Sequence, residues 1–314
     1  MGKRLCLIGV TGKKSGGVLA ELISKNIQLI NKMFPDGIVV LTRPESDISK
    51  LKVLLPEAEI HGGNIADPAF LQKYFKDVDT VIHLASIHYS SGITDAAVVC
   101  HVRRLILIHT TGIYSKYKVA GEGYRKIDDY VYRVCRENNI VLTICRPTMI
   151  YGNIYDNNVI VFVKMVDKLP IMPVVNGARY ELQPVHYSDL AKAYYEILVH
   201  EETTGNKDFN LSGGKPIMLR DMLIVIGQNL GKKVHFISCP FIIAYGGAWL
   251  VYLLSFKKMD MREKVQRLCE PRTFTHEEAS EAFGYAPMNF EEGIVAEVKQ
   301  YMNNEGISEN FITK

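Results

Sequence analysis

Short apolar runs rich in valine, isoleucine and leucine alternate with stretches of helical period along the first 150 residues. Strands of a parallel sheet read as continuous apolar runs because helices cover both of their faces. We therefore expect strands at residues 4–9, 38–42, 57–61, 80–85, 104–110 and 141–146. Helices are expected at residues 16–33, 68–75, 124–138, 188–200 and 219–230.

This order predicts an α/β fold, a doubly wound parallel sheet of the Rossmann type with a smaller C-terminal substrate domain. The regular alternation ends after Arg146, where glycine and proline become scattered. We expect residues 1–150 to form the NAD(P)-binding domain, with residues 183–212 returning to it. Residues 151–182 and 213–314 are expected to form the substrate domain.

One late segment is apolar throughout. Residues 240–256 carry no charge and are followed by Lys257 and Lys258. Their 17 residues lie at the lower limit of a bilayer span, and they include two adjacent glycines. We expect a buried or half-buried helix of the substrate domain, with a helix on a membrane surface as the alternative.

Charge and cysteine content narrow the class of protein. With 37 basic and 34 acidic residues the formal charge is +3, and no basic run interleaved with aromatics suits a nucleic acid. The six cysteines form no CxxC pair, and the N-terminus has no signal-peptide pattern. We therefore expect a cytoplasmic protein with reduced thiols and a small-molecule substrate, while no pattern predicts an oligomeric state.

A glycine-rich loop follows the first predicted strand and leads directly into a helix. Such a loop lets backbone N–H groups approach a pyrophosphate, although a tight turn without a ligand is the simpler alternative. The residues expected to contact the dinucleotide are Gly9, Thr11, Gly12, Lys13, Lys14, Ser15 and Gly16.

The end of the second strand favours NADP(H) over NAD(H). A carboxylate at this place binds the ribose hydroxyls of NAD, whereas a cation accommodates the 2′-phosphate of NADP. This chain has Arg43 there, and Lys13 and Lys14 add positive charge. The alternative is that all three are solvated surface cations.

Several further motifs follow one another along the chain: Gly63-Asn64-Ile65, His83-Leu84-Ala85-Ser86, Thr110-Thr111-Gly112-Ile113-Tyr114, Arg146-Pro147-Thr148-Met149-Ile150-Tyr151-Gly152, Gln183-Pro184-Val185-His186-Tyr187-Ser188-Asp189-Leu190-Ala191 and Phe283-Gly284-Tyr285-Ala286-Pro287. With the glycine loop, they resemble the extended branch of the short-chain dehydrogenase/reductase superfamily, the NAD-dependent epimerase/dehydratase-like proteins. The resemblance covers nearly the whole chain.

This resemblance implies roles for individual residues. Thr110, or else Thr111, is expected to hold the substrate oxygen, and Tyr124 to transfer the proton. The alternative for the threonines is that they only satisfy backbone groups at a strand end. Implied cofactor contacts are Asn64, Ile65, Leu84, Ala85, Ser86, Arg146, Pro147 and Thr148.

The chain departs from the family at the lysine that lies four residues after the tyrosine. That position holds Asp128, whose negative charge would raise the pKa of a neighbouring tyrosine. Lys126 lies about 200° around the helix from Tyr124 and does not replace the lysine. The YxxxK match from Tyr114 to Lys118 belongs to the element after strand five and not to the following helix. We interpret it as a chance match and not as the family's catalytic pair.

A second departure concerns the substrate. Nucleotide-sugar members of this branch carry an arginine four residues before His186, where this chain has Leu182, with Arg179 as the nearest cation. The Gln-Pro-Val sequence before His186 is more similar to atypical relatives. These include NmrA-like proteins and the NADPH-binding accessory subunit of respiratory complex I.

Two functions follow from these observations. The first is an NAD(P)-dependent oxidoreductase or epimerase/dehydratase-like enzyme acting on a small polar or sugar-like substrate. The second, favoured by Asp128, is an NADP(H)-binding redox sensor or accessory subunit without turnover. No histidine or cysteine pattern has metal-ligand spacing, so no metal is expected.

Overall fold

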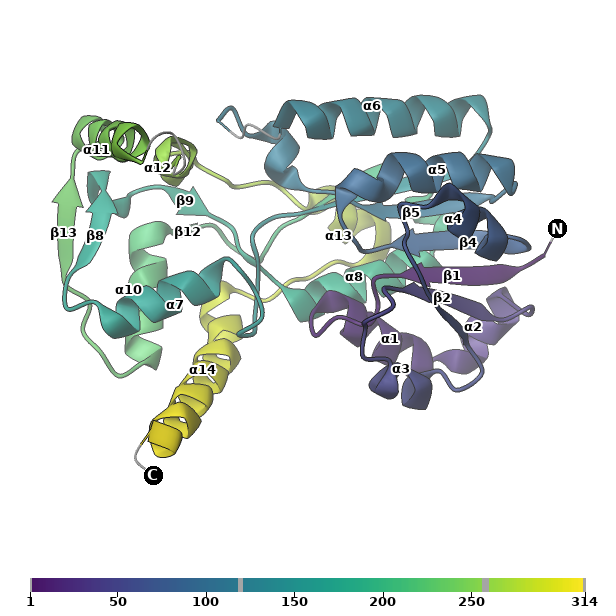
Figure 1. The fold of residues 1–314 in the computed structure, drawn as a ribbon, viewed down its shortest axis with the longest axis horizontal. Coiled ribbons are helices and arrows are strands. Elements are labelled where there is room, and N and C mark those ends of the chain that lie inside the picture. Colours follow the sequence, from purple (N-terminus) through teal and green to yellow (C-terminus); the bar gives the residue numbers. More distant parts are fainter. Residues whose placement is uncertain (1, 118–120, 256–259, 313–314) are drawn as a thin grey trace.

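The computed structural model describes residues 2–117, 121–255 and 260–312. Figure 1 shows a layered α/β body that contains the N-terminus, beside a smaller body that contains the C-terminal helix. The predicted fold class is confirmed, because helices cover both faces of one parallel sheet.

Seven parallel strands form the central sheet in the order β11-β6-β5-β4-β1-β2-β3. Each of the six predicted strands is present, with ends shifted by at most two residues. The strands are β1 (Arg4–Ile8), β2 (Ile38–Thr42), β3 (Glu59–Gly62), β4 (Val78–His83), β5 (Arg104–Ile108), β6 (Val141–Pro147) and β11 (Lys207–Leu211).

Two apolar cores lie on opposite faces of this sheet. Side chains alternate along each strand, so that Leu7 of β1 faces one core while Cys6 and Ile8 face the other. The first face is covered by α1 (Ser15–Lys25), α2 (Ile27–Met33), α3 (Ser49–Leu54), α8 (Tyr187–Val199), α9 (Glu201–Thr204) and α13 (Glu277–Phe283). The second is covered by α4 (Pro68–Tyr74), α5 (Ser90–Val99) and α6 (Gly121–Glu137).

The smaller body has its own core between α7 (Val159–Lys168), α10 (Leu219–Asn229) and α14 (Phe290–Ile312). Short strand pairs surround it: β7 (Ile150–Tyr151) with β10 (Val185–His186), β8 (Met172–Val175) with β13 (Phe236–Cys239), and β9 (Glu181–Leu182) with β12 (Ile217–Met218). Single-turn helices complete the fold: η1 (Ile87–Tyr89), η2 (Thr111–Tyr114) and η3 (Asn176–Ala178).

The chain passes between the two bodies more than once. It leaves the large body after β6, returns with α8 and β11, and leaves again before β12. Although α13 belongs to residues 213–314, its Ala279 is buried in the core beside α8 and β11. The domain boundaries stay a prediction.

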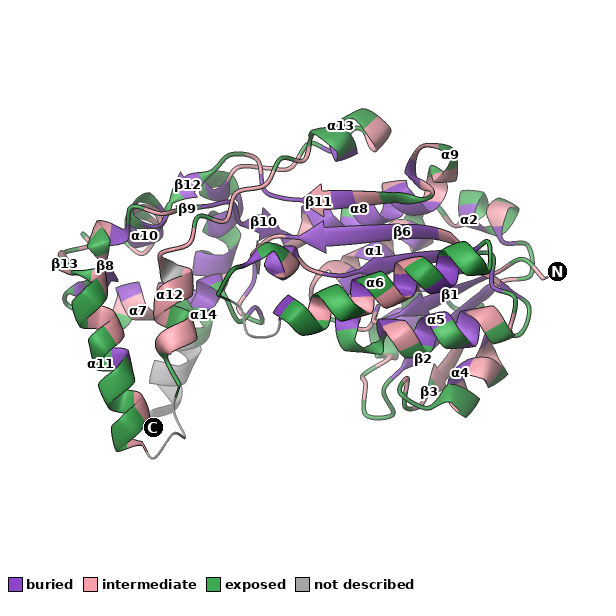
Figure 2. Cartoon of the chain, turned by 90° about the horizontal axis from the view of Figure 1, so that it is seen from above, coloured by how far each residue is buried: buried purple, intermediate pink, exposed green. Residues whose placement is uncertain are grey.

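The apolar segment that begins at Pro240 forms α11 (Phe241–Leu254), which packs against α12 (Arg262–Leu268). We expected a buried or half-buried helix. Only Ala248 of α11 is buried, Phe241, Ala244, Tyr245 and Tyr252 are intermediate, and Figure 2 shows most of the helix as exposed, so α11 is half-buried at most. Phe256, Lys257 and Lys258 lie outside the described residues. Within the described chain, no helix combines the length and hydropathy needed to cross a bilayer.

Candidate functional site

The loop between β1 and α1 is built for close backbone approach. Gly9 has a φ of +89°, and a Cβ on it would lie 3.0 Å from the amide nitrogen of Ala85. A Cβ on Gly16 would lie 2.2 Å from the carbonyl oxygen of Gly9, so the tightly packed glycine is Gly16 and Ser15 is the first residue of α1. Lys14 precedes the helix without a side-chain cap, which leaves the first N–H groups of α1 available to a phosphate. The loop therefore fits a dinucleotide.

The cations expected near a 2′-phosphate lie in different surroundings. Lys13 reaches across to the smaller body, where its Nζ donates to the Tyr155 hydroxyl at 3.0 Å and its carbonyl accepts from Asn153 at 2.9 Å. Arg43 is mostly exposed at the end of β2, with its Nε 3.4 Å from Glu45. Arg43 is thus held only by an exposed contact, which leaves its guanidinium able to turn toward a ligand. A cavity of about 600 Å³ also lies against the loop, lined in part by Thr11, Gly12, Lys13, Lys14 and Tyr155.

The turns after β3 and β4 lie at the same edge of the sheet. Asn64 accepts a hydrogen bond from the Ala66 amide at 2.9 Å, which closes the turn that also contains Ile65. The amide of Leu84 donates to the carbonyl of Ile8 at 2.8 Å, holding residues 84–86 beside the glycine loop. These residues therefore line the edge where ligands of open parallel sheets bind.

His83 is a buried neutral side chain at this edge. Burial lowers its pKa to about 4. Its Nε2 lies 3.2 Å from the carbonyl oxygen of Ser86, and because a carbonyl only accepts, Nε2 carries the proton and donates. His83 thus fixes the loop containing Ala85 and Ser86.

Asp128 is buried at the centre of a polar network. One carboxylate oxygen lies 2.7 Å from Nδ1 of His109 and the other accepts from Arg146 at 2.6 Å, while His109 also contacts the Ser90 hydroxyl at 2.9 Å. Burial raises the pKa of Asp128, but His109 and Arg146 outweigh that effect and hold it below the ordinary value. Asp128 is therefore an ionised structural anchor.

Arg146, an expected cofactor contact, has its guanidinium in the same network. Besides Asp128 it donates to Asp208 at 2.7 Å and to the Tyr132 hydroxyl at 3.0 Å. These partners come from α6 and β11, on the face of the sheet that α5 and α6 cover. The following residues, Pro147 and Thr148, lie instead at the end of β6.

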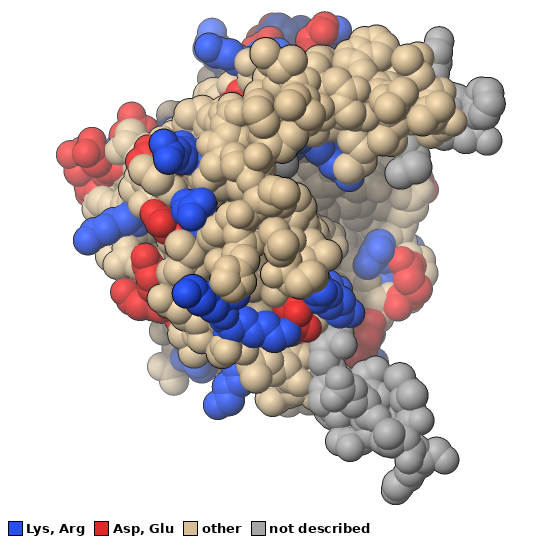
Figure 3. Space-filling model, turned by 90° about the vertical axis from the view of Figure 1, so that its left-hand side faces the viewer, with Lys and Arg blue, Asp and Glu red and all other residues tan. Residues whose placement is uncertain are grey.

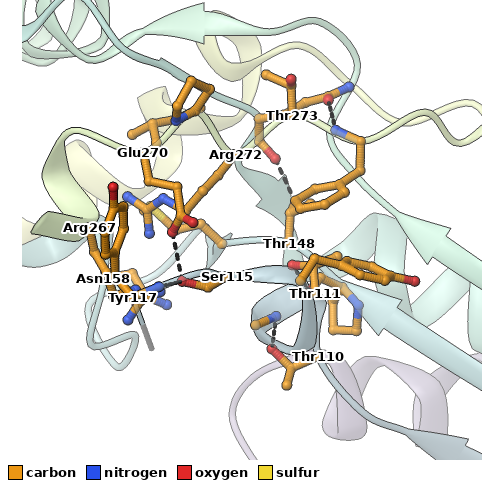
Figure 4. Close-up of a pocket in the computed structure, with 18 of the residues that line it drawn as sticks. Thr110, Thr111, Ser115, Tyr117, Thr148, Asn158, Arg267, Glu270, Arg272 and Thr273 are labelled. Carbon is orange, nitrogen blue, oxygen red and sulfur yellow. Dashed lines mark hydrogen bonds between the residues drawn. The ribbon is translucent and has the colours of Figure 1, made fainter. Parts of the chain in front are cut away.

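A cavity of about 650 Å³ opens at the carboxyl ends of β5 and β6, between the two bodies. Thr110, Thr111, Pro147 and Thr148 all line it (Figure 4). Thr110 accepts from the Gly112 amide at 3.0 Å, and Thr111 donates to the Pro147 carbonyl at 3.1 Å. The predicted substrate threonines and the end of β6 are thus brought together.

The opposite side of this cavity comes from residues 267–274, which the sequence did not single out. Arg267 and Arg272 line it, and the Nε of each has no hydrogen-bond partner among the described residues. Burial and the charge of Arg267 lower the pKa of Arg272 to about 10, so it still carries its charge at neutral pH. Arg179 is not among the lining residues described. The cavity therefore has two arginines suited to an anionic ligand.

Glu270 closes the cavity between these arginines and the loop after β5. Its carboxylate accepts from the Ser115 hydroxyl at 2.6 Å and from the Lys116 amide at 2.8 Å (Figure 4). Residues 155 positions apart in the chain are thereby joined across the mouth of the site. Neither periodicity nor a motif marks Glu270 in the sequence.

The predicted proton-transfer residue lies elsewhere. Tyr124 is on the first turn of α6, with its ring 5.6 Å from that of His88, and it is not among the described residues lining the cavity. Tyr114 and Tyr117 do line it. Lys118, the end of the YxxxK match from Tyr114, lies outside the described residues. The described residues contain no cluster of acidic, histidine and cysteine side chains suited to a metal ion.

No family model and no curated protein matches the sequence. Solved structures match nearly the whole chain. The protein gox2253 aligns over 96% of this chain and 98% of its own, at 20% identity and a TM-score of 0.75. A dTDP-glucose 4,6-dehydratase from Streptomyces venezuelae, with NAD and TYD bound, covers 96% and 98% at 16% identity and a TM-score of 0.70. A UDP-glucose 4-epimerase from Thermotoga maritima, with UDP-glucose, covers 96% and 99% at 17% identity and a TM-score of 0.67. This chain shares the fold of these proteins.

The large body has the doubly wound parallel sheet of a Rossmann domain, and in such sheets ligands bind beyond the carboxyl ends of the strands. The glycine loop, the turns after β3 and β4, and the 650 Å³ cavity all lie there. The roles of individual site residues in binding and catalysis stay predictions.

Proposed function

We propose that this protein is an NAD(P)-dependent enzyme acting on a sugar-nucleotide-like substrate bound in the 650 Å³ cavity. The observation that carries the proposal is the cavity itself, where strand-end threonines lie opposite two buried or half-buried arginines. Support also comes from similar structures, two of which are a dehydratase and an epimerase of nucleotide sugars.

Different residues of the cavity are assigned to substrate binding, to orientation of the reacting oxygen and to proton transfer. Arg272, with Arg267, binds the anionic part of the substrate, because a desolvated guanidinium binds phosphate oxygens strongly. Thr110 orients the reacting oxygen, and a bound nicotinamide would supply hydride transfer at the adjoining carbon. The proton donor is Tyr124 by the sequence argument and Tyr114 by its place in the cavity.

We propose NADP(H) as the preferred cofactor. Arg43 is exposed at the end of β2 and its closest acidic contact, Glu45, is also exposed, so the guanidinium can turn to a 2′-phosphate at little cost. Titration with NADP⁺ and NAD⁺ tests this preference. Arg43→Ala is expected to weaken NADP⁺ binding about tenfold and leave NAD⁺ binding unchanged; equal losses for both would contradict it.

Turnover of UDP- and dTDP-sugars with added NAD⁺ or NADP⁺ tests the activity. Arg272→Gln is expected to lower kcat/KM by about a hundredfold, mainly through KM, because it removes a charged contact to the substrate. Arg179→Gln, a nearby arginine that is not among the cavity lining, is the matched control. Absence of turnover, or an Arg272→Gln enzyme equal to the control, would contradict the proposal.

Single phenylalanine variants decide the proton donor. Loss of the donating phenol is expected to lower kcat by about a hundredfold or more. Tyr124→Phe has this effect if the tyrosine in the motif position is the donor. Tyr114→Phe has it if the tyrosine that lines the cavity is the donor. Two variants with unchanged kcat would exclude both phenols.

A second function is supported by Asp128, which holds the lysine position and is tied to His109 and Arg146. A sensor that uses the dinucleotide without turnover needs no activated phenol. It does need different affinities for NADP⁺ and NADPH, because only such a difference shifts a conformational equilibrium. Different affinities without turnover would favour this function.

A further inference from the structure

A helix on the surface of a soluble protein usually turns its apolar side chains toward the protein, whereas α11 turns many of them toward the solvent. At 100° per residue, its isoleucines and leucines fall on one side, and its tyrosines, its alanines and Val251 fall on the other. The aliphatic side is open to solvent, with exposed fractions of 83% for Ile242, 64% for Ile243, 57% for Leu250, 56% for Leu253 and 71% for Leu254. Neighbouring elements extend this surface through Ile237 of β13 and Met261 before α12, which are 61% and 37% exposed.

Figure 3 shows an uncharged area on this side of the molecule, with basic and acidic side chains around it. Arg262 of α12 stacks over the rings of Trp249 and Tyr252, at 4.4 and 4.0 Å from their centroids. Aromatic rings beside guanidinium groups are typical of the boundary between acyl chains and headgroups. The helix thus has an apolar face and an amphipathic edge.

The surrounding segment has an excess of basic residues. From Lys215 to Lys264, described residues include six basic and three acidic side chains, whereas the whole chain is nearly balanced. The basic ones are Lys215, Arg220, Lys232, Lys233, Arg262 and Lys264, and the acidic ones are Asp221, Asp260 and Glu263. Such a balance favours an anionic partner.

We propose that α11 lies in the plane of an anionic lipid bilayer, with its aliphatic side among the acyl chains and the basic segment at the headgroups. The helix has 14 residues, about 21 Å, and so lies in the interface and does not cross a hydrocarbon core of about 30 Å. A symmetric dimer through α11 fits less well, because it would bring the basic segment of one copy beside that of the other.

Trp249 is the one tryptophan of the chain and reports directly on the proposed contact. We expect its fluorescence to shift to shorter wavelength when full-length protein meets phosphatidylcholine vesicles containing 30% phosphatidylglycerol. The protein is expected to sediment with these vesicles, and about tenfold less with phosphatidylcholine alone or in high salt.

Replacement of Leu250 and Leu254 by serine is expected to lower vesicle affinity about tenfold or more, since both side chains would leave the acyl phase. The matched control is Val53→Ser with Val99→Ser, two valines that are 81% and 59% exposed on the Rossmann domain. The proposal is overturned if wild-type protein ignores anionic vesicles, or if both double variants bind like wild type. It is also overturned if the Trp249 shift appears without lipid and rises with protein concentration, which would identify a second copy as the partner.

Discussion

At the scale of single residues, Asp128 fastens α6 to the sheet. Its carboxylate contacts His109 after β5 and Arg146 on β6, and all three side chains are buried. In an environment of low dielectric such contacts are strong, and leaving a buried guanidinium without its partner is costly. The residue that replaces a family lysine is therefore part of the scaffold.

Asp128→Asn is expected to lower the free energy of unfolding by about 3 kcal/mol, because the neutral amide leaves the buried charge of Arg146 with a weaker partner. Denaturant titration at neutral pH measures the loss. The control is Asp129→Asn on the exposed side of the same helix, for which a change below about 0.5 kcal/mol is expected. Equal losses in the two variants would contradict the anchoring role.

The same variant has a predicted pH dependence. The folded-state pKa of Asp128 lies below its ordinary value of 3.8, so its contribution to stability is present above that pH and is lost as pH falls through the folded value. The difference in unfolding free energy between wild type and Asp128→Asn should therefore shrink below about pH 4. A constant difference would mean that the carboxylate is not the stabilising form.

The places of site residues were predictable only where a motif fixes both the position of the residue and the direction of its side chain. Thr110 and Thr148 follow strand ends, and the cavity contains both. Arg146 also belongs to the motif, but its side chain points away from the cavity and contacts Asp128 of α6 and Asp208 of β11. Contacts made by residues far apart in sequence, such as Glu270 with Ser115, leave no local pattern to read.

At the scale of elements, the glycine loop combines a fold requirement with a binding requirement. Gly16 packs against the carbonyl of Gly9, whereas a Cβ on Gly12 would meet no described atom within 4 Å. One glycine is needed for the turn, and the other leaves space beside the helix N-terminus. The two requirements are separable by substitution.

Gly16→Ala is expected to cost about 2 kcal/mol or more in stability, because the new methyl group overlaps the Gly9 carbonyl. Gly12→Ala is expected to melt like wild type but to bind NADP⁺ at least about tenfold more weakly, since its methyl occupies the path of the phosphate. Thermal melting and calorimetric titration measure both. Wild-type binding by Gly12→Ala would place the dinucleotide elsewhere.

Elements were predictable where their apolar pattern is strong. Five of the six predicted strands, β1, β2, β4, β5 and β6, are mostly buried, whereas β3 lies at the edge of the sheet and has no fully buried residue. The helix α5 was not predicted, since its buried side is made of small residues such as Ala96, Ala97 and Thr94, which give a weak pattern. The apolar run of α11 predicted a buried or half-buried helix, but such a run alone does not show how much of the helix the protein covers.

At the scale of the whole molecule, Glu270 ties residues 267–274 to the loop after β5 of the Rossmann domain. Glu270→Ala removes the acceptor of the Lys116 amide and of the Ser115 hydroxyl, so this loop should open more often. Trypsin is then expected to cut after Lys116 several-fold faster than in wild type, as fragment masses would show. Glu277→Ala, an exposed change on α13, is the control. Equal cleavage rates in both variants would mean that Glu270 does not hold the loop that contains Ser115 and Lys116.

The place of β11 at the edge of the central sheet sets an order of events during protein synthesis. Strand β6 ends at Pro147, but its neighbour β11 begins only at Lys207, after α7 of the smaller body and α8 of the large body have been made. At usual elongation rates the open edge of β6 waits on the order of 3 to 12 s for its partner. During that interval the nascent chain exposes unpaired backbone groups, the kind of edge that chaperones shield and other strands invade.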